Sequence, residues 1–214
     1  ELKKDSIRVL GVSLKTPHLV NKLKKQQGVF TALEKGTAKT LLKKIECIQE
    51  LLFAQENPRY LLKSLANEEV NLVTITVTEK GYCLIPSTGK LNFNNVDIKN
   101  DLENPENPKS VIGYLVYSLN LRKNKNVTPF TCLSCDNIPD NGKVLLSAVL
   151  EFAKEIVNQG KTQGVPFIMC SANPPSEGSL SKLQEIISNS FWVEKSNKAL
   201  SLRHLIDKII GNDD

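Results

Sequence analysis

The stretch Phe130-Thr-Cys-Leu-Ser134, followed directly by Cys135-Asp-Asn-Ile-Pro-Asp-Asn-Gly142, decides how this 214-residue chain folds. Its first half is short, uncharged and largely apolar, which is typical of a strand buried on both faces. Its second half is rich in Asp, Asn, Pro and Gly, the residues that form turns. A helical pattern of apolar residues over Lys143–Val157 comes next. Strand, polar turn and helix in this order are the repeating unit of an α/β fold.

The same alternation extends to both sides. Asn71–Thr78 is uncharged and mostly β-branched, which predicts a central strand of a parallel sheet. Further strands are expected over Ile7–Leu14, Val29–Leu33, Leu41–Ile48 and Val165–Cys170. Helices are expected over His18–Gln27, Arg59–Ala66, Ser110–Lys125, Leu180–Asn189 and Lys198–Ile210. We therefore expect an α/β fold with a mostly parallel sheet and helices on both faces.

The connecting segments carry their own predictions. Gly36–Lys39 is expected to be a turn, and residues 85–109 a long irregular excursion rich in Asn, Pro and Gly. The Ser110–Lys125 helix is predicted to be amphipathic, with Arg122 in a basic last turn that suits the helix dipole.

Composition excludes several classes of protein. Hydrophobic residues make up 40% of the chain, too many for global disorder, and no apolar run reaches the roughly 18 residues of a membrane span. Five cysteines without a framework spacing, and no secretory signal at the start of the sequence, favour a reducing, cytoplasmic setting. We expect no membrane partner.

Positive charge is concentrated near the start of the chain. Residues 1–44 hold 11 Lys and Arg against 3 acids, whereas the remainder holds 17 basic and 20 acidic residues. Such a segment would suit nucleic acid or a phosphate-bearing ligand. Its only aromatic residue is Phe30, so the stacking platform of a single-strand binder is missing. A solvated lysine-rich surface is the alternative that we prefer, and we expect no nucleic-acid partner.

Two predicted strands end in loops dense with polar groups, and ligands of α/β sheets bind where such loops leave the strands. One loop contains Glu79 and the other contains Asp136 and Asn137. The Asn137 carboxamide would donate a hydrogen bond to a substrate oxygen that gains negative charge. Asp136 or Glu79 would orient partners or accept a proton. The alternative is ordinary turn chemistry, with Asn141 capping the next helix.

Other catalytic and metal patterns are weak. Cys132-Leu-Ser-Cys135 has the C-x-x-C spacing, but no second pair completes a zinc site. We expect no metal and two reduced, structural cysteines on a buried strand. His18 and His204 are the only histidines and lie far apart in the sequence, and neither a P-loop nor G-x-G-x-x-G occurs.

Several motifs together resemble the mannitol dehydrogenase family, the long-chain polyol and sugar-acid dehydrogenases, over about residues 9–157. The matching motifs are Gly11-Val-Ser-Leu-Lys-Thr-Pro17, Gln26-Gln-Gly-Val-Phe-Thr31, Thr76-Val-Thr-Glu-Lys-Gly-Tyr-Cys83, Gly113-Tyr114 and, above all, Pro129-Phe-Thr-Cys-Leu-Ser-Cys-Asp-Asn-Ile-Pro-Asp-Asn-Gly142.

The resemblance implies a Rossmann-like domain that binds NAD or NADP, here over residues 1–160, and a helical tail over residues 161–214. It implies hydride transfer between a polyol or hexonate and the keto-sugar or keto-sugar acid, a small-molecule substrate. Asn137 would hold the substrate oxygen, and Glu79 would take part in proton movement at the cleft. Thr78 and Asp136 would line the same cleft and bind the cofactor. The oligomeric state is left open.

The resemblance also bears on the choice of cofactor. Family members that prefer NAD carry an acidic residue after the strand that corresponds to Val9–Leu14, where this chain has Lys15-Thr16-Pro17. A lysine there would suit the 2′-phosphate of NADP, so Lys15 and Thr16 are candidate cofactor-binding residues. The alternative is that Lys15 is one of many basic residues that face water.

Two parts of the family pattern are not found in the sequence. These are the first strand with its Gly-rich phosphate loop and the helix that carries the lysine general base; Ser171 stands where an aspartate is expected. The expectations are an incomplete enzyme, a degenerate paralogue or an internally shortened copy. The alternative function is a catalytically inactive nucleotide-binding or interaction protein that keeps the fold.

Overall fold

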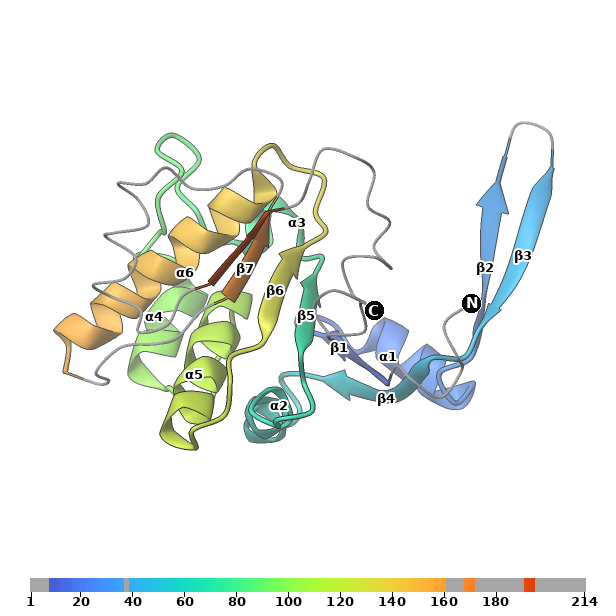
Figure 1. The fold of residues 1–214 in the computed structure, drawn as a ribbon, viewed down its shortest axis with the longest axis horizontal. Helices are drawn as coiled ribbons and strands as arrows, with labels where there is room; N and C mark the ends of the chain where they lie inside the picture. Colours follow the sequence, from blue (N-terminus) through green and yellow to red (C-terminus); the bar gives the residue numbers. More distant parts are fainter. Residues whose placement is uncertain (1–7, 37–38, 161–167, 172–190, 195–214) are drawn as a thin grey trace. The chain divides into compact units, whose positions relative to one another are not determined.

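The computed structural model describes residues 8–36, 39–160, 168–171 and 191–194. The chain divides into two compact units, Glu1–Leu61 and Leu62–Asp214, and each is described by itself (Figure 1). The predicted helices 180–189 and 198–210, the start of the predicted strand 165–170 and the middle of the predicted turn 36–39 lie outside the described residues.

The first unit contains a pair of parallel strands joined through a helix. Strands β1 (Val9–Ser13) and β4 (Ile48–Phe53) pair in parallel, from Val9 opposite Ile48 to Ser13 opposite Phe53. Helix α1 (His18–Lys25) packs against both strands and buries Val20. The strand predicted over residues 7–14 and the helix predicted over 18–27 are therefore confirmed, with shorter bounds.

An antiparallel hairpin separates α1 from β4 in the chain. Strands β2 (Phe30–Lys35) and β3 (Thr40–Ile45) pair from Phe30 opposite Ile45 to Lys35 opposite Thr40. The strand predicted over residues 41–48 is confirmed only as far as Ile45, where β3 ends, and β4 was not predicted. The chain leaves β3 after Ile45 and enters β4 at Ile48, because the two strands pair with different partners.

The second unit is built on a parallel sheet with the strand order β5-β6-β7-β8 (Figure 1). Its strands are β5 (Leu72–Ile75), β6 (Thr131–Ser134), β7 (Ile168–Ser171) and β8 (Phe191–Glu194). Every residue of β6 is buried, as expected of an inner strand. The parallel α/β architecture predicted from the sequence is confirmed. The boundary at residue 160 stays a prediction, although β7 and β8 continue this sheet beyond it.

Among the described residues, helices α5 (Val111–Asn124) and α6 (Asn141–Asn158) supply most of the buried apolar side chains of this unit. They pack on each other, with the rings of Tyr117 and Phe152 edge to face at 5.8 Å, and α6 also contacts β6 and β7. Helix α2 (Pro58–Leu65) lies within one residue of its predicted range and crosses the division between the units. A short helix, α3 (Thr78–Gly81), follows β5.

The region 85–109, predicted to be irregular, contains helix α4 (Val96–Glu103), so that prediction was wrong. The Asn95 side chain caps α4, because its Oδ1 accepts hydrogen bonds from Asp97 N (2.9 Å) and Ile98 N (3.4 Å). Asp101, buried in α4, joins it to α5: its carboxylate accepts from Lys109 N (2.6 Å), Ser110 N (3.0 Å) and Ser110 Oγ (2.5 Å). Gly113 lies so close to that carboxylate that a Cβ would overlap it. Burial raises the pKa of Asp101.

Helix α5 is not amphipathic over most of its length, because Val111–Leu119 are all buried. Arg122, predicted to lie in a basic last turn that suits the helix dipole, is 1% exposed. Its Nε donates to Thr128 O (2.6 Å) and its Nη1 to Leu65 O (3.1 Å) and Asn67 O (2.5 Å), while the guanidinium lies 5.4 Å from the Phe130 ring centroid. Burial lowers the pKa of Arg122. Hydrogen bonds to these three carbonyls, and not the helix dipole alone, explain why an arginine occupies this buried position.

Candidate functional site

The predicted polar loops leave the second unit's sheet at one edge. Strands β5 and β6 are parallel neighbours, with Ile75 opposite Ser134 at their carboxyl ends. Cys135 N continues the pairing by donating to Ile75 O at 2.8 Å. The chain then diverges into two loops, 76–83 and 135–141. This is the edge of an α/β sheet at which ligands bind.

The Asp136 carboxylate ties the two loops together. Its Oδ1 accepts from Thr78 N at 2.9 Å, and its Oδ2 accepts from Val77 N at 3.1 Å and from the Tyr82 hydroxyl at 2.7 Å. Asp136 is 7% exposed. These bonds also explain why β5 ends at Ile75 and not at Thr78 as predicted: the backbone N–H groups beyond it turn to the carboxylate.

Tyr82 and Ser134 complete a buried network behind this carboxylate. Tyr82 is fully buried, and its hydroxyl oxygen lies 2.7 Å from Ser134 Oγ. Burial raises the pKa of Tyr82 well above its ordinary value, so the phenol keeps its proton. Burial by itself would raise the pKa of Asp136, but the hydrogen bonds from Tyr82 and from two backbone N–H groups outweigh it and lower that pKa. The carboxyl group is therefore ionised at neutral pH.

The turn from Val77 to Cys83 has an uncommon backbone. Thr78 (φ +64°) and Cys83 (φ +56°) lie in the left-handed region, which a β-branched residue such as threonine rarely adopts. Gly81 packs against Val77 so closely that a Cβ would lie 2.6 Å from the valine Cβ. This conformation depends on the contacts around it, and the Asp136 carboxylate supplies two of them.

The second loop is held by Asn141. Its Nδ2 donates to Asp136 O at 2.8 Å and to Ser134 O at 3.3 Å. The predicted capping role of Asn141 was wrong: α6 begins at this residue, and Asp140, with φ +49°, precedes the helix. The carboxamide fixes the loop that carries Asn137.

The structure brings four of the predicted site residues together and divides them by exposure. Thr78, Glu79 and Asn137 are exposed, whereas Asp136 is buried between the loops. The turn interpretation thus describes the Asp136 side chain, while Asn137 and Glu79 face solvent. Tyr82 and Ser134 were not predicted as site residues, although both lie inside the quoted motifs.

Lys15 and Thr16 belong to the first unit, in the loop after β1. Both are exposed, and the loop is held by Ser13 Oγ, which donates to Thr16 O at 2.6 Å, and by Gln55 Nε2, which donates to Leu14 O at 3.1 Å. The backbone next to Lys15 is therefore fixed from both sides.

The cysteines fit the prediction only in part. Cys132 is fully buried in β6, and its burial raises the pKa of the thiol. Cys135 is exposed just beyond the strand, so its predicted burial was wrong. Both are free thiols. Within the described part of the chain, no group of three or more His, Cys, Asp or Glu side chains could hold a metal ion.

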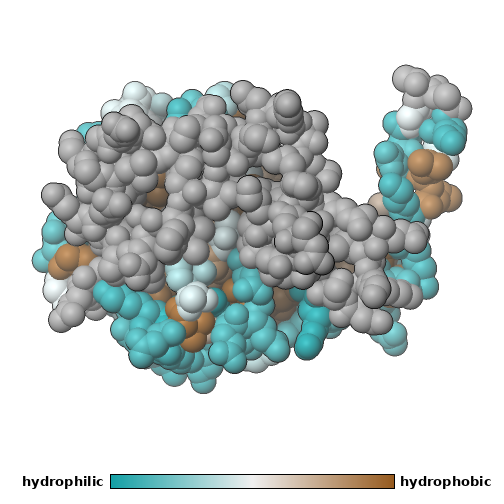
Figure 2. Space-filling view, viewed as in Figure 1, coloured by the Kyte–Doolittle hydropathy of each residue, from teal (hydrophilic) through white to brown (hydrophobic). Residues whose placement is uncertain are grey.

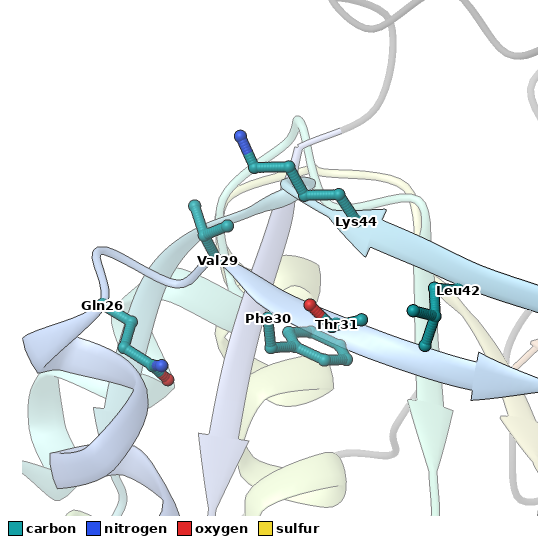
Figure 3. Close-up of a pocket in the computed structure, with 6 residues that line it drawn as sticks. All are labelled: Gln26, Val29, Phe30, Thr31, Leu42 and Lys44. Carbon is teal, nitrogen blue, oxygen red and sulfur yellow. The ribbon is translucent and has the colours of Figure 1, made fainter.

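A second surface feature lies in the first unit, and none of the residues that line it was a predicted site residue. A shallow hollow of about 580 Å³ opens between the end of α1 and the hairpin, with Lys44 projecting from β3 at its rim (Figure 3). Apolar side chains gather on the hairpin between hydrophilic ones (Figure 2). Leu33 (54% exposed) and Leu42 (69%) face each other there across the strands.

Comparison with known proteins identifies the family. Residues 2–172 match the model of the mannitol dehydrogenase Rossmann domain. The chain belongs to the mannitol dehydrogenase family. The resemblance drawn from the motifs is confirmed, and the Rossmann-like architecture with it.

Named relatives agree with this assignment. The chain is 45% identical over 137 residues to D-mannonate oxidoreductase of Escherichia coli, covering 64% of this chain and 28% of the relative. It is 32% identical over 151 residues to the polyol:NADP oxidoreductase of Gluconobacter oxydans, covering 68% and 31%. The chain thus spans less than a third of the length of these curated relatives.

A solved structure shows the same fold. The mannitol 2-dehydrogenase of Pseudomonas fluorescens, in a ternary complex with NAD and D-mannitol, superposes with a TM-score of 0.65 at 29% identity. The match covers 83% of this chain and 38% of that protein. The names of these proteins agree with the expectation of NAD or NADP as the family's cofactor. Within the described residues, no helix has both the length and the apolar character needed to cross a membrane.

Proposed function

We propose that this chain forms the nucleotide-binding part of an NAD(P)-dependent oxidoreductase. The enzyme would interconvert a polyol or hexonate with the corresponding keto-sugar or keto-sugar acid. The observation that carries the proposal is the edge formed by β5 and β6, where the Asp136 carboxylate joins two loops. One loop carries Glu79 and the other carries Asn137, and both residues are exposed. Family membership supplies the class of reaction.

The residues at this edge fit a bound nicotinamide nucleotide and a polyol. When bound, the nucleotide supplies or accepts the hydride. Asn137 would donate a hydrogen bond to the substrate oxygen as negative charge develops on it. Glu79 would accept or relay a proton at the mouth of the cleft. Asp136 would act through the backbone of Thr78, because both of its carboxylate oxygens are already engaged.

We propose further that Lys15 and Thr16 lie beside the adenosine ribose and favour NADP. The support is their position after β1, in a loop fixed by Ser13 and Gln55, and the absence of a carboxylate among residues 14–17. Lys15→Glu should shift preference from NADPH toward NADH, whereas Lys22→Glu, an equal charge change on exposed α1, should not. An unchanged preference in Lys15→Glu would remove Lys15 from the cofactor site.

The direct test is a fluorescence titration of the 214-residue chain with NADH and NADPH, combined with assays of fructose, fructuronate and tagaturonate reduction. We expect saturable nucleotide binding with little turnover, because the family's lysine-bearing helix was not found in this sequence. Asn137→Ala should leave nucleotide affinity nearly unchanged. A clear loss of nucleotide affinity in Asn137→Ala would instead show that Asn137 is only a turn residue.

The alternative function, an inactive nucleotide-binding or interaction protein, shares the same edge. It predicts nucleotide binding with no turnover under any condition. Robust turnover would exclude it and would place the base among these residues, with Lys80 next to Glu79 the first candidate.

A further inference from the structure

We propose that Tyr82 is a positioning residue of this site: its hydroxyl, acting through Asp136, holds the backbone of Val77 and Thr78 in the conformation that presents Glu79. The link to the reaction rests on the function proposed above. The geometry of the network does not.

The direction of the hydrogen bonds follows from the chemistry of three groups. The Tyr82 hydroxyl lies 2.7 Å from both Asp136 Oδ2 and Ser134 Oγ, and it has one proton. An ionised carboxylate only accepts, so Tyr82 donates to Asp136. Ser134 must then donate to Tyr82. The result is a one-way chain from Ser134 through Tyr82 to Asp136, which leaves the carboxylate aimed at Val77 N and Thr78 N.

The turn needs such support. Thr78 has φ +64°, and a β-branched residue rarely adopts a left-handed backbone without compensating contacts. The contacts that hold the turn include Gly81 against Val77 and the two backbone hydrogen bonds to Asp136. The carboxylate reaches the turn from the other loop, and Tyr82 is its side-chain partner in this network.

The two ends of this network are sequence neighbours of the two exposed candidates. Thr78 precedes Glu79, and Asp136 precedes Asn137. A change in how Asp136 is held therefore alters both loops at once. This location distinguishes Tyr82 from the other buried tyrosines, Tyr114 and Tyr117, which lie in α5.

Tyr82→Phe removes only the hydroxyl, and Tyr117→Phe is its matched control. Tyr117 is also buried, and its hydroxyl donates one hydrogen bond, to Asp101 O at 2.6 Å, outside the site. NMR of the 214-residue chain would follow exchange of the Thr78 amide and titration of the Asp136 carboxyl carbon. In Tyr82→Phe we expect the amide to exchange about tenfold faster, as when one hydrogen bond to a charged group is lost. The pKa of Asp136 should rise, because a donor that lowers it is gone.

A second variant tests the hydrogen-bonded chain from its other end. Ser134→Ala removes the donor to the Tyr82 hydroxyl and should shift both signals in the same direction by less.

The proposal is overturned if Tyr82→Phe leaves both NMR signals unchanged, or if Tyr117→Phe moves them equally. If neither the parent chain nor any variant binds NADH or NADPH, the proposed function fails, while the NMR signals still decide whether Tyr82 positions the turn.

Discussion

Asp136→Asn is the substitution that most directly tests the junction of the two loops. A carboxamide has the shape of the carboxylate but only one accepting oxygen. If its Nδ2 takes the place of Oδ1, it faces Thr78 N; if it takes the place of Oδ2, it faces both Val77 N and the Tyr82 hydroxyl. Either orientation sets the new Nδ2 donor against at least one donor that the carboxylate accepted from, at a side chain that is 7% exposed in the parent.

The expected loss follows from these contacts. Hydrogen bonds to an ionised group contribute roughly 1.5–3 kcal/mol, and the bonds that survive in Asp136→Asn become neutral and weaker. We therefore expect the free energy of unfolding at pH 7 to fall by about 3 kcal/mol, a large part of the roughly 5–15 kcal/mol typical of a domain. Urea denaturation followed by far-ultraviolet circular dichroism measures it.

The pH dependence gives an independent check on the cause. The pKa of Asp136 is lower in the folded chain than its value of about 3.9 in unfolded peptides. Its stabilising contribution is complete above the unfolded pKa and is lost as pH falls through the folded pKa, since the unfolded chain takes up the proton first. The stability difference between the parent and Asp136→Asn should thus be constant near neutrality and narrow below about pH 4. The raised pKa of Asp101 is common to both chains and cancels. Equal stability at pH 7, or a difference that does not narrow in acid, would refute the reasoning.

Three further substitutions test packing described above, each by thermal or urea unfolding. Gly81→Ala should lower stability by about 1–3 kcal/mol, because its Cβ would lie 2.6 Å from that of Val77; an unchanged midpoint would contradict this contact. Gly113→Ala should lose at least as much, since its Cβ overlaps the Asp101 carboxylate, and a stable variant would mean that α4 and α5 can separate there. Arg122→Met keeps the length of the apolar stem but loses three hydrogen bonds to carbonyls, and should lower stability by about 2–4 kcal/mol; a gain would show that desolvation of the charge dominates.

Local sequence patterns predicted most of the elements whose structure depends on their own residues. The buried strand Thr131–Ser134 and the helices α1, α5 and α6 all follow from apolar spacing. The strand predicted over residues 41–48 was drawn too long because Ile48 pairs with Val9 in a different strand pair, and that pairing is not visible in local periodicity. The burial of Arg122 was missed for the same reason, since two of its acceptors lie 55 and 57 residues away in sequence.

The site divides in the same way. The polar composition of two strand ends was enough to predict which loops would meet, because parallel strands bring their carboxyl ends to one edge. Composition could not say which residue of the Asp136–Asn137 pair turns inward. That depends on the register of Ile75 opposite Ser134, which sets the distance from the carboxylate to the Thr78 amide. Tyr82 was missed because its partner lies on another strand.

The hydrogen bonds that join the two loops also constrain the order in which the chain can mature. Asp136 contacts partners that precede it by 58 and 59 residues. As the protein is synthesised from its N-terminus, α1 and the β2–β3 hairpin can form from contacts close in sequence, whereas the turn at Thr78 must wait until residue 136 has emerged and β6 has joined β5. Until then the threonine backbone is free to relax into a commoner conformation. The native conformation of the turn that carries Glu79 is thus formed late, and its appearance would mark the point at which β6 has paired with β5.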